Sequence, residues 1–409
     1  MLKQTFKTCK LKEIASFEMG QSPDSSFVNE DGKGLPFLQG CAEFGSQTPN
    51  YNFYCSQPKK NAEAGDILIS VRAPVGTLNK ADRNYCIGRG LAAVRFNKDT
   101  LPQLGWHLLN YWSRELQRVA QGSTFEAVGK SELENLKVLE IPKYEQQKIA
   151  EILDTVDKTI ALTQTHISKL KLAKAGLLHD LLTKGIDEHG ELRNPTRNPQ
   201  QFKDSSLGRI PKDWDVVNLE SLCERITDGS HQSVTTSDTG IPFLYVSCVR
   251  DGQILWEQAA KISDLLYTQI SKGREPKAGL ILYTAVGSYG HAALVRDNRK
   301  FSFQRHIAYV LPNPEKIFWI SCLWLNSPKC KNHADKVALG NAQKTVTLGA
   351  LGAFPVAFPR NLEEQKNILE YFDGYEKQII NKQTQLEKLK LLKLGLMSDL
   401  LTGKVRVKI

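Results

Sequence analysis

The chain has 409 residues, of which 41% are hydrophobic, 24% charged and 8% aromatic. Ordinary folded proteins have these proportions, so the composition excludes a disordered or collagen-like chain, and the length predicts two or three domains. No apolar run approaches the roughly 18 residues of a membrane-spanning helix, and no signal peptide opens the chain, so we expect a cytoplasmic protein without a membrane partner. The net charge of +10 suits a polyanionic partner such as DNA but does not require one.

Residues 1–141 are predicted to form a first domain of short strands and one helix. Runs of apolar and β-branched residues at 67–71 and 91–96 indicate strands, and a helical pattern covers 105–120. We therefore expect an α+β domain (mixed α/β) with a twisted mixed sheet, whose topology the sequence leaves open.

Residues 142–184 are predicted to contain one long helix, and Pro142 stands just before the start of that helix, where proline is tolerated. Apolar residues recur at alternating steps of four and three, which is the heptad seam of a coiled coil. The seam residues are Ile149, Leu153, Val156, Ile160, Ile167, Leu170, Leu177 and Leu181. A helix of about 38 residues is about 57 Å long, which suits a spacer better than a core element.

Residues 185–209 are predicted to form a polar, turn-rich linker, and residues 210–358 a second α+β domain. The strand signals of this domain lie at 243–249, 280–284 and 308–311, and its helix is expected at 316–325. Short matches relate the two domains, with changed loop lengths between them. They pair 36–38 with 242–244, 65–69 with 279–283, and 89–94 with 305–310.

Residues 359–409 are predicted to form a second long helix and a tail. The segment from 364 to 402 repeats the segment from 145 to 183 at a constant offset of 219, with roughly half of the positions identical. The seam residues of this copy are Ile368, Phe372, Tyr375, Ile379, Leu386, Leu389, Leu396 and Leu400.

The interruptions of the seam predict the relative direction of the two helices. Lys174 and Lys393 occupy equivalent seam positions. A parallel pair would bury these two like charges against each other without a partner. An antiparallel pair instead places Lys174 opposite Tyr375, where the amine can reach solvent. We therefore predict antiparallel coiled-coil helices that hold the two domains apart about a pseudo-twofold axis.

Signatures of catalysis are missing from the sequence. Gly122 and the run Gly129-Lys130-Ser131 resemble a phosphate-binding loop, but their spacing is two residues too long. No HExxH, no GxGxxG after a strand and no CxxC pair among the eight cysteines is present. We therefore expect no catalytic residue, no metal site and no cofactor in this chain, and favour a binding protein.

Several motifs resemble those of the specificity (S) subunits of type I restriction–modification systems, over essentially the entire chain. At the helix borders they are Pro142-x-x-Glu145-Gln146, Leu178-x-Asp180-Leu181-Leu182-Thr183 and Gly208-x-Ile210-Pro211-x-x-Trp214. Inside the domains they are Gly65-Asp66-Ile67-Leu68, Arg72-Ala73-Pro74-Val75-Gly76 and Phe303-Gln304-Arg305-His306-Ile307-Ala308.

The resemblance implies a function and a set of partners. Each target-recognition domain would read one half of a bipartite, asymmetric site on double-stranded DNA, and the coiled coil would set the gap. The helices would dock two methylation (M) subunits, which use S-adenosylmethionine to methylate adenine N6. Two restriction (R) subunits would add cleavage that depends on ATP and Mg²⁺. The chain itself would be no enzyme and would bind none of these cofactors.

Polar and basic side chains in loops beside the predicted strands are the candidates for DNA contact, because such groups read base edges or bind phosphates. In the first domain they are Gln39, Arg72, Arg89, Ser123, Thr124 and Lys130. In the second they are Ser230, His231, Tyr289, Gln304, Arg305, His306, Asn341, Gln343 and Lys344. Arg89 and Arg305 rank first because both copies keep an arginine there, although a repeated arginine can also support the fold through a backbone carbonyl.

Two other functions are compatible with the residues alone. The chain could be a coiled-coil adaptor that arranges proteins without sequence-specific DNA binding, or an enzyme fusion, against which the missing motifs speak. Lysine clusters at 169–174 and 388–393 fit either DNA between the two domains or a solvated helix face.

Overall fold

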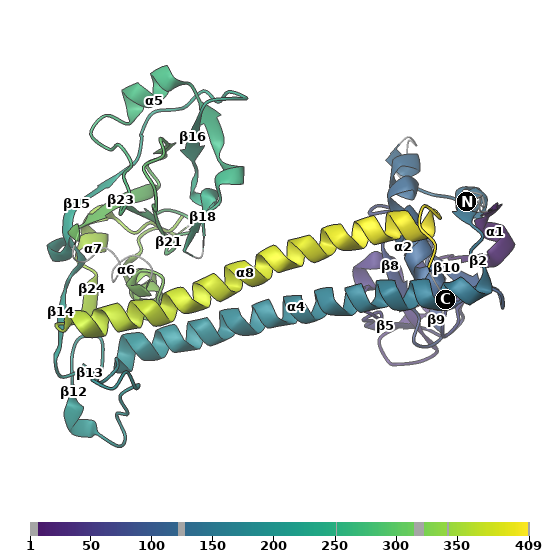
Figure 1. Cartoon of the computed structure of the whole chain (residues 1–409), viewed down its shortest axis with the longest axis horizontal. Helices are drawn as coiled ribbons and strands as arrows, with labels where there is room; N and C mark the ends of the chain where they lie inside the picture. The colour runs from purple at the N-terminus through teal and green to yellow at the C-terminus, as the bar shows by residue number, and fades with distance from the viewer. Residues whose placement is uncertain (1–6, 122–126, 251, 315–322, 342, 408–409) are drawn as a thin grey trace. The chain divides into compact units, whose positions relative to one another are not determined.

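The computed structural model describes residues 7–121, 127–250, 252–314, 323–341 and 343–407. The chain forms two compact units: unit 1 consists of Met1–His166 with Lys382–Ile409, and unit 2 of Ile167–Asn381. The two long helices, α4 (Lys143–Lys184) and α8 (Leu362–Leu401), each contribute to both units (Figure 1). The domain boundaries inferred from the sequence stay predictions. None of the helices in the described ranges combines the length and apolarity that a bilayer crossing needs.

Unit 1 contains two sheets and a separate strand pair. Its strands are β1 (Thr8–Lys10), β2 (Ala15–Met19), β3 (Val28–Asn29), β4 (Leu35–Leu38), β5 (Phe53–Cys55), β6 (Asn61–Ala62), β7 (Ile67–Ser70), β8 (Leu78–Lys80), β9 (Tyr85–Ile87), β10 (Leu91–Phe96) and β11 (Lys137–Leu139). Its shorter helices are α1 (Leu11–Ile14), α2 (Pro102–Gln121) and α3 (Lys130–Asn135). The first sheet has the antiparallel order β2-β10-β7-β8, and the second has the mixed order β3-β5-β4-β9-β6, in which β4 and β9 are parallel. The strand β1 pairs with β11.

Strand β7 is buried on both faces because its alternate side chains enter two cores. Ile67 and Ile69 join the core beneath α2, whereas Leu68 packs with Leu38 and Ile87 of the second sheet. This explains why the strand is a continuous apolar run rather than an alternating one. The mixed helix-and-strand class predicted for this part of the chain is confirmed.

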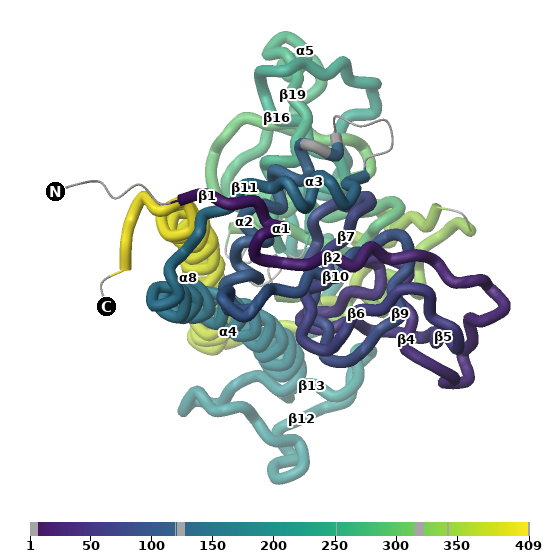
Figure 2. Tube along the Cα trace, turned by 90° about the vertical axis from the view of Figure 1, so that its right-hand side faces the viewer, coloured from purple at the N-terminus to yellow at the C-terminus, as the bar shows by residue number. Residues whose placement is uncertain are grey.

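Helix α2 connects the first sheet of unit 1 with the long helices. Leu109 belongs to the core on the sheet side, and Leu104 and Leu108 pack with Leu153 of α4 and Met397 of α8. Figure 2 shows α2 between the β2–β10 pair and the two long helices. The apolar residues of α2 thus serve two interfaces, which fixes the sheet relative to the helix ends within this unit.

Unit 2 repeats this plan with different loops. Its strands are β12 (Phe202–Lys203), β13 (Ile210–Pro211), β14 (Trp214–Asn218), β15 (Cys223–Asp228), β16 (Ile241–Leu244), β17 (Val249–Arg250), β18 (Gln253–Ile254), β19 (Ala260–Ile262), β20 (Ile281–Thr284), β21 (Ala292–Leu294), β22 (Ser302–Phe303), β23 (Ile307–Pro312) and β24 (Pro355–Pro359). Its shorter helices are α5 (Asp264–Ile270), α6 (Pro328–Val337) and α7 (Leu348–Gly352). The order β15-β23-β20-β21 matches the first sheet of unit 1, and β16 pairs in parallel with β22 as β4 does with β9. The helix predicted over 316–325 lies largely outside the described residues.

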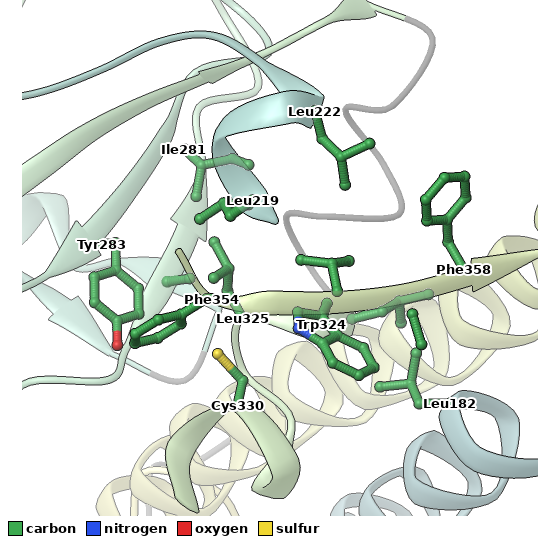
Figure 3. Close-up of a cluster of buried hydrophobic side chains, with 14 of the residues drawn as sticks. Leu182, Leu219, Leu222, Ile281, Tyr283, Trp324, Leu325, Cys330, Phe354 and Phe358 are labelled. Atoms are coloured by element: carbon green, nitrogen blue, oxygen red, sulfur yellow. The ribbon is translucent and has the colours of Figure 1, made fainter. Parts of the chain in front are cut away.

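The main core of unit 2 joins its sheet to the long helices. Tyr283 of β20, Phe354, and Trp324 are fully buried in one cluster with Leu182 of α4 and Phe372 of α8. Figure 3 shows Trp324 and Leu182 close together in this cluster, beneath β24, which leads directly into α8. Burying the indole and the two aromatic rings therefore ties the sheet to both helices.

The prediction of one continuous strand over 243–249 is wrong. Strand β16 ends at Leu244, and β17 begins at Val249 after a short 3-10 turn. The turn forms because the backbone N–H of Cys248 donates to the carbonyl of Tyr245 at 2.9 Å. An apolar run by itself does not reveal such a break, since the turn still buries Cys248 and partly buries Tyr245 and Val246.

The two long helices run antiparallel within each unit, as predicted. In unit 1, Asp157 of α4 pairs with Lys393 of α8 at 2.6 Å, and in unit 2, Lys174 of α4 pairs with Glu376 of α8. Both pairs have residue numbers with the same sum, which is the relation between facing positions of antiparallel helices. All sixteen predicted seam residues are buried or partly buried.

The seam lysines differ from the expectation that their amines reach solvent. The side chain of Lys174 is only 19% exposed, and its amine lies 4.3 Å from the ring centroid of Phe372 as well as beside Glu376. Lys393 is similarly covered and bonds to Asp157. The repeat offset relates Asp157 to Glu376 as it relates the lysines, so one ion pair occurs twice. A carboxylate on the facing helix thus neutralises each interruption of the seam.

A buried carboxylate fixes the start of α8. Glu364 accepts hydrogen bonds from both terminal nitrogens of Arg193 (2.5 and 3.1 Å), from the Ile186 backbone N–H (3.0 Å) and from Trp214 Nε1 (3.2 Å). Its side chain is only 4% exposed. The equivalent Glu145 at the start of α4 accepts from Arg406. In each unit, therefore, the segment after one long helix holds the first turn of the other.

Candidate nucleic-acid interface

The first sheet of each unit gathers several chain segments at one end. In unit 1, Met19 pairs with Ala92 and Ser70 with Leu91, so β2 and β7 end where β10 begins. We call the segments at this end the loop face of unit 1: residues 20–22, 71–77, 88–90 and 127–129. The same pairing occurs in unit 2, where β15 and β20 end at the beginning of β23. The loop face of unit 2 comprises residues 229–232, 285–291, 304–306, 339–341 and 343–345.

The two loop faces have the same backbone frame, in which four hydrogen bonds occur at equivalent places. In unit 1 they run from Gly88 N to Leu38 O (2.7 Å), Leu91 N to Gly88 O (3.0 Å), Val71 N to Gly90 O (2.9 Å) and Val128 N to Val71 O (2.9 Å). In unit 2 they run from Gln304 N to Leu244 O (3.1 Å), Ile307 N to Gln304 O (3.0 Å), Ala285 N to His306 O (2.9 Å) and Val346 N to Ala285 O (2.8 Å). The internal repeat predicted from short sequence matches is thus confirmed in the backbone.

A buried hydroxyl holds the longest shared loop in both units. Ser70 Oγ accepts from the backbone N–H of Thr77 at 2.9 Å, and Thr284 Oγ1 accepts from that of His291 at 2.9 Å. The two loops have the same length, and each contains a glycine with positive φ at the same place, Gly76 in unit 1. Because a buried hydroxyl fixes the backbone of this loop in each unit, the side chains on its outer surface can differ between the units.

The candidates of the first domain that the structure describes lie on or beside the loop face of unit 1. Arg72 and Arg89 are exposed on it. Gln39 is exposed beside the 88–90 turn, where a Cβ at Gly90 would lie 2.7 Å from the Gln39 carbonyl oxygen. Lys130 begins α3 and lies 3.7 Å from Glu134. The candidates Ser123 and Thr124 lie outside the described residues.

Five candidates of the second domain form a cluster on the loop face of unit 2: Ser230, His231, Gln304, Arg305 and His306. The backbone N–H of Arg305 donates to the Ser230 carbonyl at 2.9 Å, and Gln304 Nε2 lies 3.3 Å from His306 Nδ1. Burial, followed by the neighbouring Arg305 and His231, lowers the pKa of His306. The Ser230 side chain is buried, so it supports the turn rather than facing solvent.

The other candidates of the second domain lie on the neighbouring loops of this face. Asn341, Gln343 and Lys344 are exposed, and the Lys344 carbonyl accepts from the Gly287 backbone N–H at 3.0 Å. Tyr289 donates to Asp335 Oδ1 at 2.7 Å, and this hydrogen bond raises the pKa of Tyr289. The structure thus brings these residues together, while DNA contact by each of them stays a prediction.

Sequence reasoning missed residues that orient the loop face of unit 2. Arg250 Nη1 lies 2.8 Å from His291 Nε2, and Arg274 Nη1 donates to the Gly229 carbonyl at 3.0 Å. Both arginines come from segments far along the chain from their partners. No local motif signals such a contact, because only the fold brings these partners together.

Each loop face consists of several loops, and clustered reactive groups are not found there among the described residues. Within the described ranges, no three His, Cys, Asp or Glu side chains gather in a way that could hold a metal ion. A cavity of about 800 Å³ in unit 1 lies elsewhere, at the start of α4, where Lys143, Gln146 and Arg406 line it. The loop faces are therefore the described surfaces where the candidate residues concentrate.

Comparisons with known proteins agree with this arrangement. Residues 3–172 and 211–391 match the protein family described as "Type I restriction modification DNA specificity domain". The putative type I restriction enzyme MjaX specificity subunit of Methanocaldococcus jannaschii is 41% identical over 169 residues, which are 41% of this chain and 40% of that protein. The MjaVIII specificity subunit of the same organism is 28% identical over 303 residues, covering 72% of this chain and 68% of that protein.

A solved structure has the same fold over almost the full length. The S subunit of a type I restriction–modification system from M. genitalium gives a TM-score of 0.54 at 13% identity and covers 98% of both chains. The family match covers both copies of the internal repeat, each with its loop face and its part of the long helices. The chain therefore belongs to the family of type I restriction–modification DNA specificity subunits.

Proposed function

We propose that this chain is the non-catalytic recognition subunit of a type I restriction–modification complex and that each loop face reads one half of a bipartite, asymmetric DNA site. The observation that carries this proposal is the shared frame with different side chains. The same loop presents the exposed Arg72 in unit 1 and the partly exposed Val286 in unit 2. Val75, which is buried in the core of unit 1, stands where the partly exposed Tyr289 stands in unit 2. Two readers with one frame and different surfaces are suited to two different half-sites.

The charge of the loop faces supports DNA as the ligand. Arg72, Arg89 and Arg305 are exposed, and none of them pairs with a carboxylate among the described residues. Arginine supplies bidentate contacts to guanine and to phosphate, and amide side chains such as Gln343 match adenine. Half or more of the hydrogen bonds in protein–DNA complexes go to the backbone, so several exposed cations beside a few amides fit such an interface.

The long helices are the proposed spacer and docking surface. With 42 and 40 residues they are each about 60 Å long. Large apolar side chains on them are exposed: Leu162 and Leu391 in unit 1, and Leu172 and Ile380 in unit 2. Exposed apolar residues on a charged helix suit a partner helix. We assign this surface to two methylation and two restriction subunits, which supply S-adenosylmethionine, ATP and Mg²⁺ chemistry.

In vitro selection tests the proposal directly. The full chain, alone and with its methylation subunits, is incubated with duplexes that carry two randomised blocks separated by gaps of varied length. We expect one split sequence with a fixed gap to be enriched, and its affinity to fall steeply as salt rises. Variants at Gln343 should change only the second half-site, with the exposed Arg360→Ala as a charge control outside the loop faces. Enrichment of no split sequence under any condition would favour a protein adaptor instead.

A further inference from the structure

We propose that Arg89 and Arg305 are matched phosphate anchors, which bind the DNA backbone in the same way in both units and leave base reading to the residues that differ. This inference rests on the function proposed above. It assigns a sequence-independent role to the two arginines that the sequence alone ranks first as DNA contacts.

The two arginines occupy the same place in the same turn. A hydrogen bond of 3.0 Å from Leu91 N to Gly88 O closes the turn around Arg89, and one of 3.0 Å from Ile307 N to Gln304 O closes the turn around Arg305. Both turns connect a strand of the second sheet to a strand of the first. The backbone therefore presents each guanidinium from an equivalent and fixed position.

Within the part of the chain that the structure describes, neither arginine supports the fold through its side chain. Arg89 is exposed, and its guanidinium makes no hydrogen bond or ion pair with any residue that the structure describes. The only side-chain bond of Arg305 within the described ranges is a long contact of 3.4 Å from Nε to His306 Nε2. In the described parts of the chain, neither guanidinium donates a hydrogen bond to a backbone carbonyl. The alternative that the repeated arginine supports the fold through such a carbonyl therefore does not apply there.

Some other exposed arginines of this protein have carboxylate partners, whereas Arg72, like Arg89 and Arg305, has none among the described residues. Arg83 pairs with Asp82 at 3.1 Å, Arg299 with Asp297 at 2.7 Å, and Arg360 with Asp215 at 2.6 Å. What sets Arg89 and Arg305 apart is that they occupy equivalent places on the two loop faces and that neither has a carboxylate partner among the described residues. They are available to an external anion.

The anion must be a feature that both half-sites have in common. The rest of the turn differs between the units, since Gly88 and Gly90 in unit 1 stand where Gln304 and His306 stand in unit 2. Different side chains suit different base edges, whereas an identical side chain on an identical frame suits an identical ligand. The phosphodiester backbone is the part of the duplex that does not change with sequence.

Binding measurements with the full chain test this assignment. The variants are Arg89→Ala, Arg305→Ala and the double variant, and the ligands are the selected split target and a mixed-sequence duplex without it. We expect each single variant to weaken binding to both duplexes by the same factor, about tenfold, which is the loss of one charge-assisted contact. The slope of log affinity against log salt should shrink by about 0.9 for each arginine removed.

Two further variants separate a charge effect from a loss of folding or of base reading. Arg89→Lys keeps the charge and should restore the salt slope, whereas Arg360→Ala removes an equal charge outside the loop faces and should change little. Unchanged affinity and slope in the alanine variants would overturn the assignment, as would lost discrimination at one half-site with normal binding to the mixed duplex. If the parent chain selects no split target, the proposed function fails, but the salt slope on the mixed duplex still tests the anchors.

Discussion

Replacing Glu364 by alanine should destabilise unit 2 strongly, because four donors lose their acceptor at once. Deleting one partner of a buried ion pair costs about 3–5 kcal/mol, and buried donors left unpaired cost about 1–3 kcal/mol each. These losses are not additive here, because Asp213 lies 3.2 Å from Arg193 Nη2 and keeps part of the charge compensated. We therefore expect the free energy of unfolding of unit 2 to fall by about 4 kcal/mol.

The matched control is Asp215→Ala, which breaks an arginine–carboxylate pair of similar geometry at the surface. Arg360 bonds to Asp215 at 2.6 and 2.8 Å, but its side chain is 67% exposed, so the loss should be much smaller than that caused by Glu364→Ala. Urea unfolding gives the global stability, and hydrogen exchange at the Ile186 amide, which donates to Glu364, reports the local effect. Equal destabilisation by the two variants would refute the reasoning that burial makes this carboxylate decisive.

Two further predictions concern the long helices. His107 of α2 is fully buried, with Nε2 2.9 Å from Asp154 of α4, and burial lowers its pKa. Because the unfolded chain binds this proton more readily, stability should fall as the pH drops below about 6.5, and urea unfolding of His107→Gln should show a smaller fall. Inserting seven residues after Gln164 and after Thr384, at facing positions, lengthens the helix pair by about 10 Å or three base pairs. In vitro selection should then return the same half-sites with a longer gap. Binding should be lost altogether if the added base pairs turn one half-site about the duplex axis, away from its loop face. Selection of the original gap would contradict the spacer role of the helices.

The periodic part of this protein is determined by the sequence itself. The heptad seam and the constant repeat offset predict two long helices, and the lysine at one seam position predicts their antiparallel direction. The reason is local, since a helix places residues three and four apart on one face whatever the rest of the chain does. The carboxylates that pair with Lys174 and Lys393 could have been predicted in the same way, because the repeat offset that relates the two lysines also relates Asp157 to Glu376.

Only the tertiary structure decided how the recognition surface is assembled. The loop face of unit 1 combines segments near residues 20, 72, 89 and 128, which meet because β10 lies between β2 and β7. Such pairings join residues far apart in sequence and leave no local pattern, so the sequence indicated candidate side chains but not their neighbours. The same holds for Glu364, whose partners Arg193 and Trp214 are brought to it by packing. Helical periodicity is a local property that can be seen in the sequence, whereas a cluster of loops forms only after the strands have paired in their final order.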